Sequence, residues 1–276
     1  MAFENEIKKY EELRQRYQSL IINKMDREEY IMYNEVLFST HSCAIEGNSF
    51  SVDDTRELKE KGLGMIPAGK TLFEAFEMLD HFEAYEYMIQ HLQHPLDENL
   101  LKEINKRVTL HTLRSPDAIP GEYTTTDMAA GDTVFGDHEE LIARVPQLLE
   151  STEKAIQAVI QAKNADRKQK EATNALHPMV LAARFHGFYD YLHPFRDGNG
   201  RTGRLVSNYI LLRLGHPLLV IPSDCRNEYI SALRMIRTEA TDEHLIHFFF
   251  KMATDRMEQE IKQKEANTNR FRAFLF

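Results

Sequence analysis

A twelve-residue run in the second half of the chain gathers the side-chain types that phosphate chemistry needs. It reads His193-Pro-Phe-Arg-Asp-Gly-Asn-Gly-Arg-Thr-Gly-Arg204, and amphipathic segments flank it on both sides, which predicts a loop between two buried helices. Gly198, Asn199 and Gly200 permit backbone conformations that turn successive N–H groups inward. They stand where the second helix should begin, so its dipole adds positive potential. The pattern predicts an anion-binding nest with a phosphate as its guest.

The charged residues of the run point to a polyanion and a metal ion. Arg201 and Arg204 are neighbours on the first turn of the following helix, where cations oppose the dipole unless an anion lies between them. Asp197 offers one hard oxygen ligand, and a carboxylate together with substrate phosphates commonly holds Mg²⁺. His193, with an ordinary pKa of about 6.5, can take a proton from an attacking hydroxyl. This set of residues suits phosphoryl-type transfer, in which the protein mainly positions groups and stabilises charge.

The run resembles the signature of the Fic family, His-Pro-Phe-x-Asp/Glu-Gly-Asn-Gly-Arg-x-x-Arg, at every defined position. The neighbouring segments resemble the core of that family over roughly residues 97–240. The resemblance implies a protein adenylyltransferase that moves AMP from ATP–Mg²⁺ to a Ser, Thr or Tyr hydroxyl of a target protein, and of itself, with release of pyrophosphate. Gly200 matters here, because the related Doc-type kinases carry Lys at that place.

The resemblance also assigns roles to individual residues. His193 becomes the general base, and the other roles follow: Asp197 as the Mg²⁺ ligand, Gly198, Asn199 and Gly200 as the anion hole, Arg201 and Arg204 as clamps on the ATP phosphates, and Tyr229 in the adenine pocket. The alternative interpretation makes His193 a loop histidine, lets Asp197 and Asn199 cap the next helix, and leaves the arginines on a solvated face. That alternative suits any one residue but does not explain the ordered set.

The stretch from Tyr123 to Phe135 departs from the helical pattern. Its Tyr-Thr-Thr-Thr, Ala-Ala-Gly-Asp and Thr-Val-Phe segments predict a short β-hairpin. A lone hairpin is marginally stable, so it should rest on the helices and leave an edge that pairs with an extended peptide. By resemblance this hairpin is the flap that docks the target, through Tyr123, Thr124, Thr125 and Thr126.

A second motif, Ser42-Cys-Ala-Ile-Glu46-Gly-Asn48, closes an expected helix. Glu46 in the last turn faces the negative end of the dipole, so it gains from an external cation. The stretch resembles the inhibitory motif Ser/Thr-x-x-x-Glu-Gly/Asn that some Fic proteins carry ahead of their core. The resemblance implies that Glu46 pairs with Arg204, that Ser42 positions Glu46, and that ATP then binds unproductively. Without the Fic run, Glu46 would be read as a surface residue before a Gly-Asn helix stop.

The rest of the chain predicts an all-α fold, with the hairpin as its one exception. Apolar residues recur every three or four positions in most segments. We expect an N-terminal region at 1–95 carrying the inhibitory motif, a catalytic core at 96–240 and a C-terminal helix and tail at 241–276. A helix is expected over the apolar pattern from Leu72 to Leu92, and further helices at 5–24, 27–46, 52–62, 97–113, 138–162, 170–192, 200–214, 224–238 and 241–266.

Composition narrows the classes of partner and compartment. The chain has 276 residues, 42% of them hydrophobic, and a formal net charge of -9, so we expect no nucleic-acid partner. Two cysteines, Cys43 and Cys225, do not suggest a disulfide framework. Neither a secretory leader nor a membrane span is apparent, so a cytoplasmic protein without membrane contact is expected. Its partners should be ATP and a target protein, and the resemblance allows a homodimer.

Other readings of the sequence remain to be weighed. Residues 64–71 fit the P-loop pattern, but a polar helix rather than a strand should precede them. The histidines, among them His81, His177 and His186, do not follow a known metal-ligand spacing. The same site could also remove AMP from a modified protein, with Glu46 orienting water. A peptide-binding module without catalysis is a further alternative, although it leaves His193 without a role.

Overall fold

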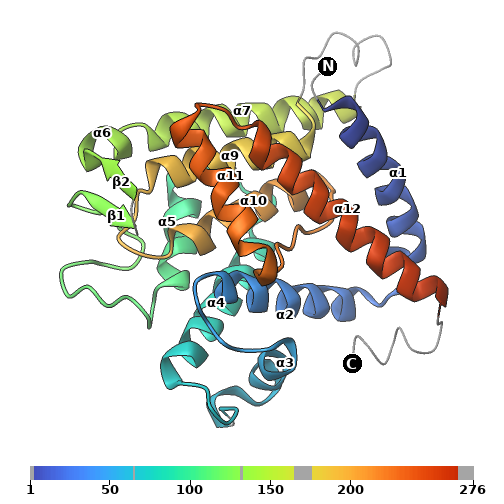
Figure 1. The fold of residues 1–276 in the computed structure, drawn as a ribbon, viewed down its shortest axis with the longest axis horizontal. Helices are drawn as coiled ribbons and strands as arrows, with labels where there is room; N and C mark the ends of the chain where they lie inside the picture. The colour runs from blue at the N-terminus through green and yellow to red at the C-terminus, as the bar shows by residue number, and fades with distance from the viewer. Residues whose placement is uncertain (1–2, 65, 131–132, 165–175, 267–276) are drawn as a thin grey trace.

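Segments with apolar residues at the helical period fold into helices in the computed structural model, which describes residues 3–64, 66–130, 133–164 and 176–266 (Figure 1). The helices are α1 (Glu4–Leu20), α2 (Arg27–Ile45), α3 (Val52–Lys61), α4 (Leu72–Gln90), α5 (Glu98–Val108), α6 (His138–Ile142), α7 (Val145–Asn164), α9 (Pro178–Leu192), α10 (Asn199–Arg213), α11 (Arg226–Thr238) and α12 (Glu243–Ala266). One antiparallel pair, β1 (Met128–Ala130) and β2 (Thr133–Gly136), makes the only sheet among the described residues. The predicted all-α fold with a short hairpin is confirmed.

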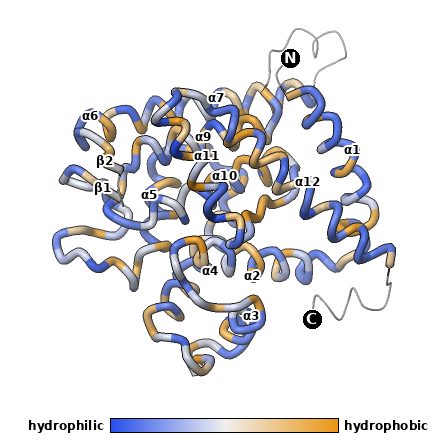
Figure 2. Tube along the Cα trace, in the orientation of Figure 1, coloured by the Kyte–Doolittle hydropathy of each residue, from blue (hydrophilic) through white to orange (hydrophobic). Residues whose placement is uncertain are grey.

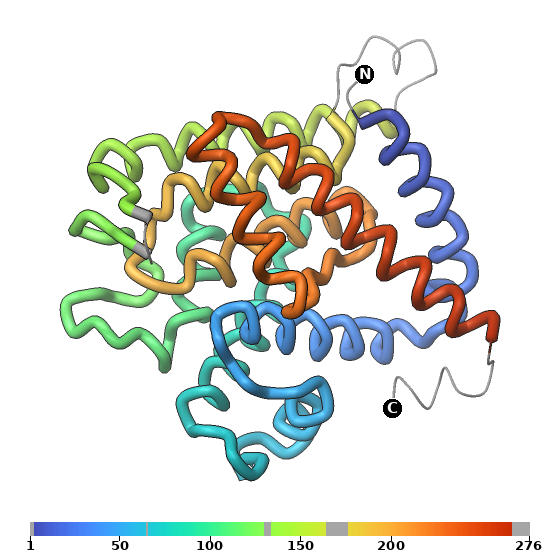
Figure 3. Tube along the Cα trace, viewed as in Figure 1, coloured from blue at the N-terminus to red at the C-terminus, as the bar shows by residue number. Residues whose placement is uncertain are grey.

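Helices α9 and α10 form the centre of the molecule. They are packed against each other, with α4, α5, α7, α11 and α12 around them (Figures 1 and 3). Residues of α10 are buried from Arg201 to Leu211, as expected for a helix covered on all sides. Gly203 permits the close approach of α9, because a Cβ there would lie 2.8 Å from Nδ1 of His186. The loop that joins α9 to α10 is therefore held between two buried helices.

The N-terminal helices cover this centre from two sides. Helix α1 packs along α12, whereas α2, α3 and α4 lie together at another edge (Figure 1). Apolar and polar residues are interspersed along these outer helices (Figure 2). One hydrophobic cluster includes Tyr10, Tyr85, Phe185 and Phe249, and thus joins all three predicted regions. A separate small cluster, including Cys43 and Met78, fastens α2 to α4.

Several predicted helix boundaries are wrong for identifiable reasons. The predicted helix 97–113 ends at Val108, because Asp80 accepts the His111 amide at 2.8 Å and draws it out of the helical pattern. The predicted helix 138–162 is two helices, since Pro146 in the first turn of α7 lacks the N–H of a helix interior. The predicted helix 170–192 begins at Pro178, with His177 as its N-cap. Residues 165–175 lie outside the described residues.

The hairpin is shorter than predicted, and its first strand begins later. Strand β1 starts at Met128, so the segment from Tyr123 to Thr126 is not part of it. Val134 and Phe135 in β2 point to opposite sides: Val134 is 76% exposed, whereas Phe135 is buried against the helices. The hairpin thus rests on the helical core by one face, as a marginal two-stranded sheet must.

No helix among the described residues is long and apolar enough to cross a membrane.

Candidate active site

The run from His193 to Arg204 forms the turn between α9 and α10, and its own side chains hold its backbone. His193 ends α9 in a left-handed conformation with φ 46°, and its amide donates to the Tyr189 carbonyl at 3.0 Å. The Asn199 side chain accepts the Phe195 amide at 3.0 Å and donates to the Phe195 carbonyl at 2.7 Å. The Asn199 side chain thus holds the loop in shape, while its backbone is the part that the sequence analysis predicted to bind phosphate.

A residue that the sequence analysis did not single out holds the loop from α5. Asn105 Nδ2 donates to the Asp197 carbonyl at 3.0 Å and to Thr202 Oγ1 at 3.1 Å. Gly198 follows in a left-handed conformation with φ 74° and is the N-cap of α10. The predicted glycine nest therefore lies at the start of a buried helix, where backbone N–H groups and the dipole favour an anion.

His193 lies beneath the hairpin. Its ring stacks on the Phe135 ring with 3.9 Å between the centroids and 22° between the planes. Burial, and then the positive charge of Arg237 on α11, lower the pKa of His193 to about 4. At neutral pH the imidazole is therefore uncharged, which is the form that a general base requires.

Arg204 lies at the opposite end of the loop, and its Nε and Nη2 donate to residues at the end of α2. Its Nη2 donates to Glu46 Oε1 at 2.8 Å and to the Ser42 carbonyl at 2.8 Å, and its Nε donates to Ser42 Oγ at 3.0 Å. The family resemblance implied a pair between Glu46 and Arg204, and the structure brings the two side chains together. Ser42, however, contacts the arginine and not the glutamate.

The Glu46 carboxylate lies against the glycine nest as well. A Cβ built on Gly200 would lie 2.4 Å from Glu46 Oε1 and 3.1 Å from Arg204 Nη1. Desolvation works to raise the pKa of Glu46, but the charges of Arg204 and Arg201 outweigh it, and the pKa lies below its ordinary value. Glu46 is thus an ionised carboxylate in the position where the nest would hold an anion.

Arg201 is engaged by a carboxylate that the sequence analysis did not identify. Its Nη1 lies 2.8 Å from Glu77 Oε1 on α4, and its Nη2 lies 3.3 Å from Asp197 Oδ1. Asn48, at the end of the inhibitory motif, donates to Glu77 Oε2 at 2.8 Å and to the Glu74 carbonyl at 3.0 Å. Both arginines of the run therefore face glutamates from different N-terminal helices.

Asp197 meets the requirements of a Mg²⁺ ligand. Its side chain is 45% exposed beside the nest, and Oδ1 accepts the Gly198 amide at 2.5 Å. A single hard carboxylate oxygen next to a phosphate site fits Mg²⁺, which takes few protein ligands and keeps phosphate and water for the rest. A Mg²⁺ ion bound there would share the Asp197 carboxylate with Arg201.

The remaining predicted residues lie close to the run, but not as expected. Tyr123 pairs with Phe195 in an isolated bridge, and the Thr124 amide donates to the Pro194 carbonyl at 2.9 Å. Thr125 and Thr126 follow on the surface outside the hairpin, so these four residues border the loop and do not form a strand of the flap.

Tyr229, predicted in the adenine pocket, is buried beside Arg204. Its hydroxyl lies 2.5 Å from Nε2 of His186 and 3.5 Å from Nη1 of Arg204. Burial raises the pKa of the Tyr229 hydroxyl above its ordinary value, although the charge of Arg204 acts to lower it. The hydroxyl therefore stays protonated. Tyr229 thus lies against the Arg204 guanidinium and helps to hold it in place.

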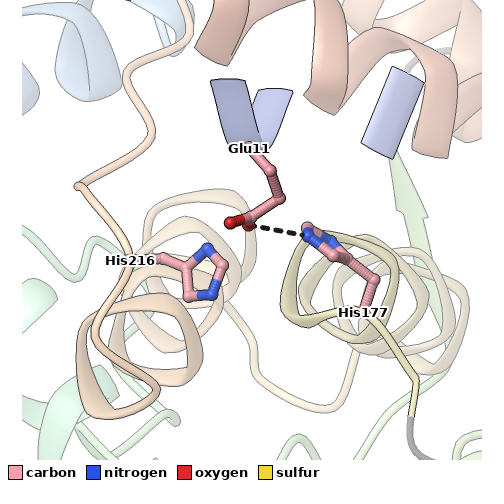
Figure 4. Close-up of side chains that lie close together, drawn as sticks. All are labelled: Glu11, His177 and His216. Carbon is pink, nitrogen blue, oxygen red and sulfur yellow. Dashed lines mark hydrogen bonds and ion pairs between the residues drawn. The ribbon is translucent and has the colours of Figure 1, made fainter. Parts of the chain in front are cut away.

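A cluster of Glu11, His177 and His216 lies between α1, α9 and the end of α10 (Figure 4). The Arg14 guanidinium donates hydrogen bonds to both carboxylate oxygens of Glu11 at 2.7–3.1 Å. His177 Nδ1 accepts the Met179 amide at 3.2 Å, so the proton sits on Nε2, which points to Glu11 at 3.2 Å. A metal at Nε2 would need the opposite tautomer. The cluster therefore joins α1 to the start of α9 and the end of α10.

The P-loop reading of residues 64–71 also lacks its structural context. Helix α3 and a 3₁₀ turn at Gly62–Gly64 come before it, and Thr71 caps α4 through a capping box with Glu74. The Lys70 ammonium lies 3.4 Å from Asp54 and contacts the Ser49 carbonyl. Lys70 thus fastens this loop to its neighbours, and a helix stands where a P-loop requires a strand.

Comparisons with known proteins agree with this geometry. The model of the Fic/DOC family matches residues 95–211. The protein adenylyltransferase Fic of Drosophila grimshawi is 32% identical over 201 residues, which are 71% of this chain and 36% of that protein. The Nematostella vectensis protein of the same name is 33% identical over 199 residues, which are 70% of this chain and 41% of that protein. The chain thus spans only about two fifths of the curated relatives that it matches.

Solved structures show the same fold. A Fic domain-containing signalling protein of Bacteroides thetaiotaomicron superposes with a TM-score of 0.74 at 23% identity, covering 94% of this chain and 97% of that one. Caenorhabditis elegans Fic-1 superposes with a TM-score of 0.70 at 21% identity, covering 92% of this chain and 70% of that one. IbpAFic2, solved covalently tethered to Cdc42, superposes with a TM-score of 0.52 at 20% identity, covering 88% of this chain and 70% of that one. Residues 95–211, which contain the His193–Arg204 loop, therefore form a domain of the Fic family.

Proposed function

We propose that this chain transfers AMP from ATP to a Ser, Thr or Tyr hydroxyl of a target protein, and that Glu46 restrains the reaction. The observation that carries the proposal is the loop from His193 to Arg204, which presents a neutral base and two arginines around a glycine nest. Relatives with about 30% identity are named protein adenylyltransferases. The Cdc42 complex of IbpAFic2, which shares the fold, supports a protein as the acceptor.

The proposed reaction uses His193 as the acceptor of a proton. The target hydroxyl oxygen attacks the α-phosphorus of ATP, and its proton passes to Nε2 of His193 as the new P–O bond forms. The bond from the α-phosphorus to the bridging oxygen breaks, and pyrophosphate leaves. The nest at Gly198 and Gly200 stabilises the charge that grows on the α-phosphate oxygens. Mg²⁺, held by Asp197 and the phosphates, would neutralise further charge.

The proposed restraint acts through Arg204. While Arg204 is paired with Glu46 at 2.8 Å, its guanidinium cannot also grip a phosphate. The Glu46 oxygen beside Gly200 also places a negative charge where the phosphates must lie. ATP therefore binds in an unproductive position until the end of α2 moves. We further propose a homodimer, in line with the family resemblance, and a cytoplasmic location, in line with the composition.

Intact-protein mass spectrometry after incubation with ATP and Mg²⁺ tests the proposal. The Glu46→Gly chain should gain the mass of one or more AMP groups, and the chain with Glu46 much less. His193→Ala combined with Glu46→Gly should lower the labelling rate by about 100- to 10,000-fold, the contribution of a general base. Unlabelled Glu46→Gly protein would contradict the transfer. Equal labelling with and without Glu46 would contradict the restraint alone.

A further inference from the structure

Arg237, in the last turn of α11, contacts two parts of the site at once. Its Nη2 donates to the carbonyl of Asp190 at 2.6 Å and to that of Tyr191 at 2.7 Å. These carbonyls belong to the last turn of α9 and have no partner within the helix. A cation at this end is also favoured by the helix dipole. Arg237 thus fixes the helix end from which His193 projects.

The same guanidinium also holds the hairpin. Its central carbon lies 4.3 Å from the centre of the Phe135 ring and 4.6 Å from that of the Tyr191 ring. Phe135 in turn stacks on His193 at 3.9 Å. Phe135 therefore lies in contact with both the charge of Arg237 and the imidazole. A two-stranded hairpin does not hold its position alone, so this stack fixes the flap against the base.

We propose that Arg237 is a positioning residue, which fastens the hairpin through Phe135 to the end of α9 and so orients His193 for proton transfer. This proposal rests on the adenylyl transfer proposed above. A helix cap alone would need only the two carbonyl contacts. The stack on Phe135 adds the connection to the hairpin, which a purely structural cap does not require.

Charge is the second consequence of this placement. The charged groups that act on His193 are Arg237 on α11 and Glu46 on α2, and the backbone of Asp190 on α9 adds a hydrogen bond to it. Apart from burial, the main influence that lowers the His193 pKa is Arg237, while Glu46 raises it. Removing the Arg237 charge should therefore raise the pKa of His193, so that the imidazole starts to be protonated at a higher pH.

Two measurements with matched variants test the proposal. Histidine NMR with ¹³C labelling, on the chain that retains Glu46, reports the titration midpoint of His193, which His193→Ala assigns. Arg237→Gln should raise that midpoint by about 1 pH unit, the effect of one nearby charge. Arg237→Lys retains the charge and should shift it less. Arg234→Gln, on the exposed side of the same helix, should leave it unchanged.

The second measurement is the self-labelling rate with ATP and Mg²⁺ in the Glu46→Gly background. Arg237→Gln should lower the rate at least about tenfold, because a loosened flap and base misplace the reacting groups. The acidic limb of its pH profile should move upward with the NMR midpoint. Phe135→Leu, which keeps an apolar contact but removes the ring stack, should lower the rate with the Arg237 charge in place.

Each outcome decides the proposal. If Arg237→Gln leaves both the midpoint and the rate unchanged, the proposal is overturned. A lower rate with an unchanged midpoint reduces Arg237 to a helix cap and overturns it as well. If Arg237→Gln does not fold, Arg237→Lys and Phe135→Leu decide by the rate and its pH profile. If Glu46→Gly protein fails to label at all, adenylyl transfer is contradicted, while the NMR midpoint still tests the arginine.

Discussion

Two glutamates engage the two arginines of the catalytic loop, and they differ in how they are held. Glu46 is the C-cap of α2, its side chain is 37% exposed, and its carboxylate contacts Arg204 at 2.8 Å. Glu77 is in the interior of α4, only 9% exposed, and is held by Asn48 as well as by Arg201. One carboxylate stands at a helix end that can move into water. The other is enclosed by its surroundings.

The electrostatics follow the same division. Burial raises the pKa of Glu77 in spite of Arg201, whereas the arginines lower the pKa of Glu46 in spite of desolvation. A buried charge that loses its partner is strongly destabilised, but a half-exposed one finds water instead. The comparison indicates that Glu46 works as a releasable restraint on Arg204, and that Glu77 works as a fixed support for Arg201.

The largest expected effect is on activity. Glu46→Gly should raise the self-labelling rate about tenfold or more, because a charge-assisted hydrogen bond contributes about 1.5–3 kcal/mol and exposure favours the lower end of that range. Glu46→Gln, which keeps the size of the side chain but not its charge, should raise it in the same direction. Glu77→Gln should not raise it. Activation by Glu77→Gln that equals activation by Glu46→Gly would remove the distinction between the two glutamates.

The sequence could predict Glu46 but not Glu77, for a physical reason. Glu46 lies in a short motif, and its partner Arg204 lies in another, and the resemblance of both motifs to those of the Fic family implied a contact between them. Glu77 is one acidic residue among several on α4, and only the packing of α4 against α10 selects it. Asn105, Phe135 and Arg237 escaped prediction in the same way. Each comes from a separate element and gains its role through tertiary contact.

The second prediction concerns stability and reverses the order of the two residues. Glu77→Gln should lower the free energy of unfolding by about 3 kcal/mol, because the buried Arg201 loses its nearer carboxylate and keeps only the half-exposed Asp197 at 3.3 Å. Glu46→Gln should cost less, about 1–2 kcal/mol, because the buried Arg204 keeps its two hydrogen bonds to Ser42. Urea denaturation measures both values. The control is Glu83→Gln, an exposed residue of the same helix, with a change within about 0.5 kcal/mol. Equal losses at 46 and 77 would argue against a fixed support.

The fold was more accessible to sequence reasoning than the site. Helical periodicity places nearly every helix, because burial of one face depends on local spacing. The boundaries failed where a distant group intervened, as Asp80 does at His111, or where one proline divided a helix, as Pro146 does. The predicted start of the first hairpin strand was wrong because Tyr123 and Thr124 pair with the catalytic loop. β propensity does not reveal such a contact.

The third prediction uses the nest to test where the Glu46 carboxylate lies. Gly200→Ala should cost about 1 kcal/mol in the chain with Glu46, because the new methyl group would meet Oε1 at 2.4 Å. In the Glu46→Gly background the same change should be neutral or stabilising, as alanine usually is in a helix. Gly64→Ala, where a Cβ has open space, serves as the control. A cycle with no coupling would place the carboxylate elsewhere.

The smallest expected effect separates the two possible roles of Ser42. The sequence suggested that Ser42 positions Glu46, whereas its hydroxyl accepts from Arg204 Nε at 3.0 Å. Ser42→Ala should therefore loosen the arginine and raise the self-labelling rate about two- to fivefold, as expected for one modest hydrogen bond. Ser42→Thr, which keeps a hydroxyl, should restore the original rate. The effect of Ser42→Ala should persist in the Glu46→Gly background, because the bond to Arg204 does not involve the glutamate. If it disappears there, Ser42 acts through Glu46, and the restraint is a single unit.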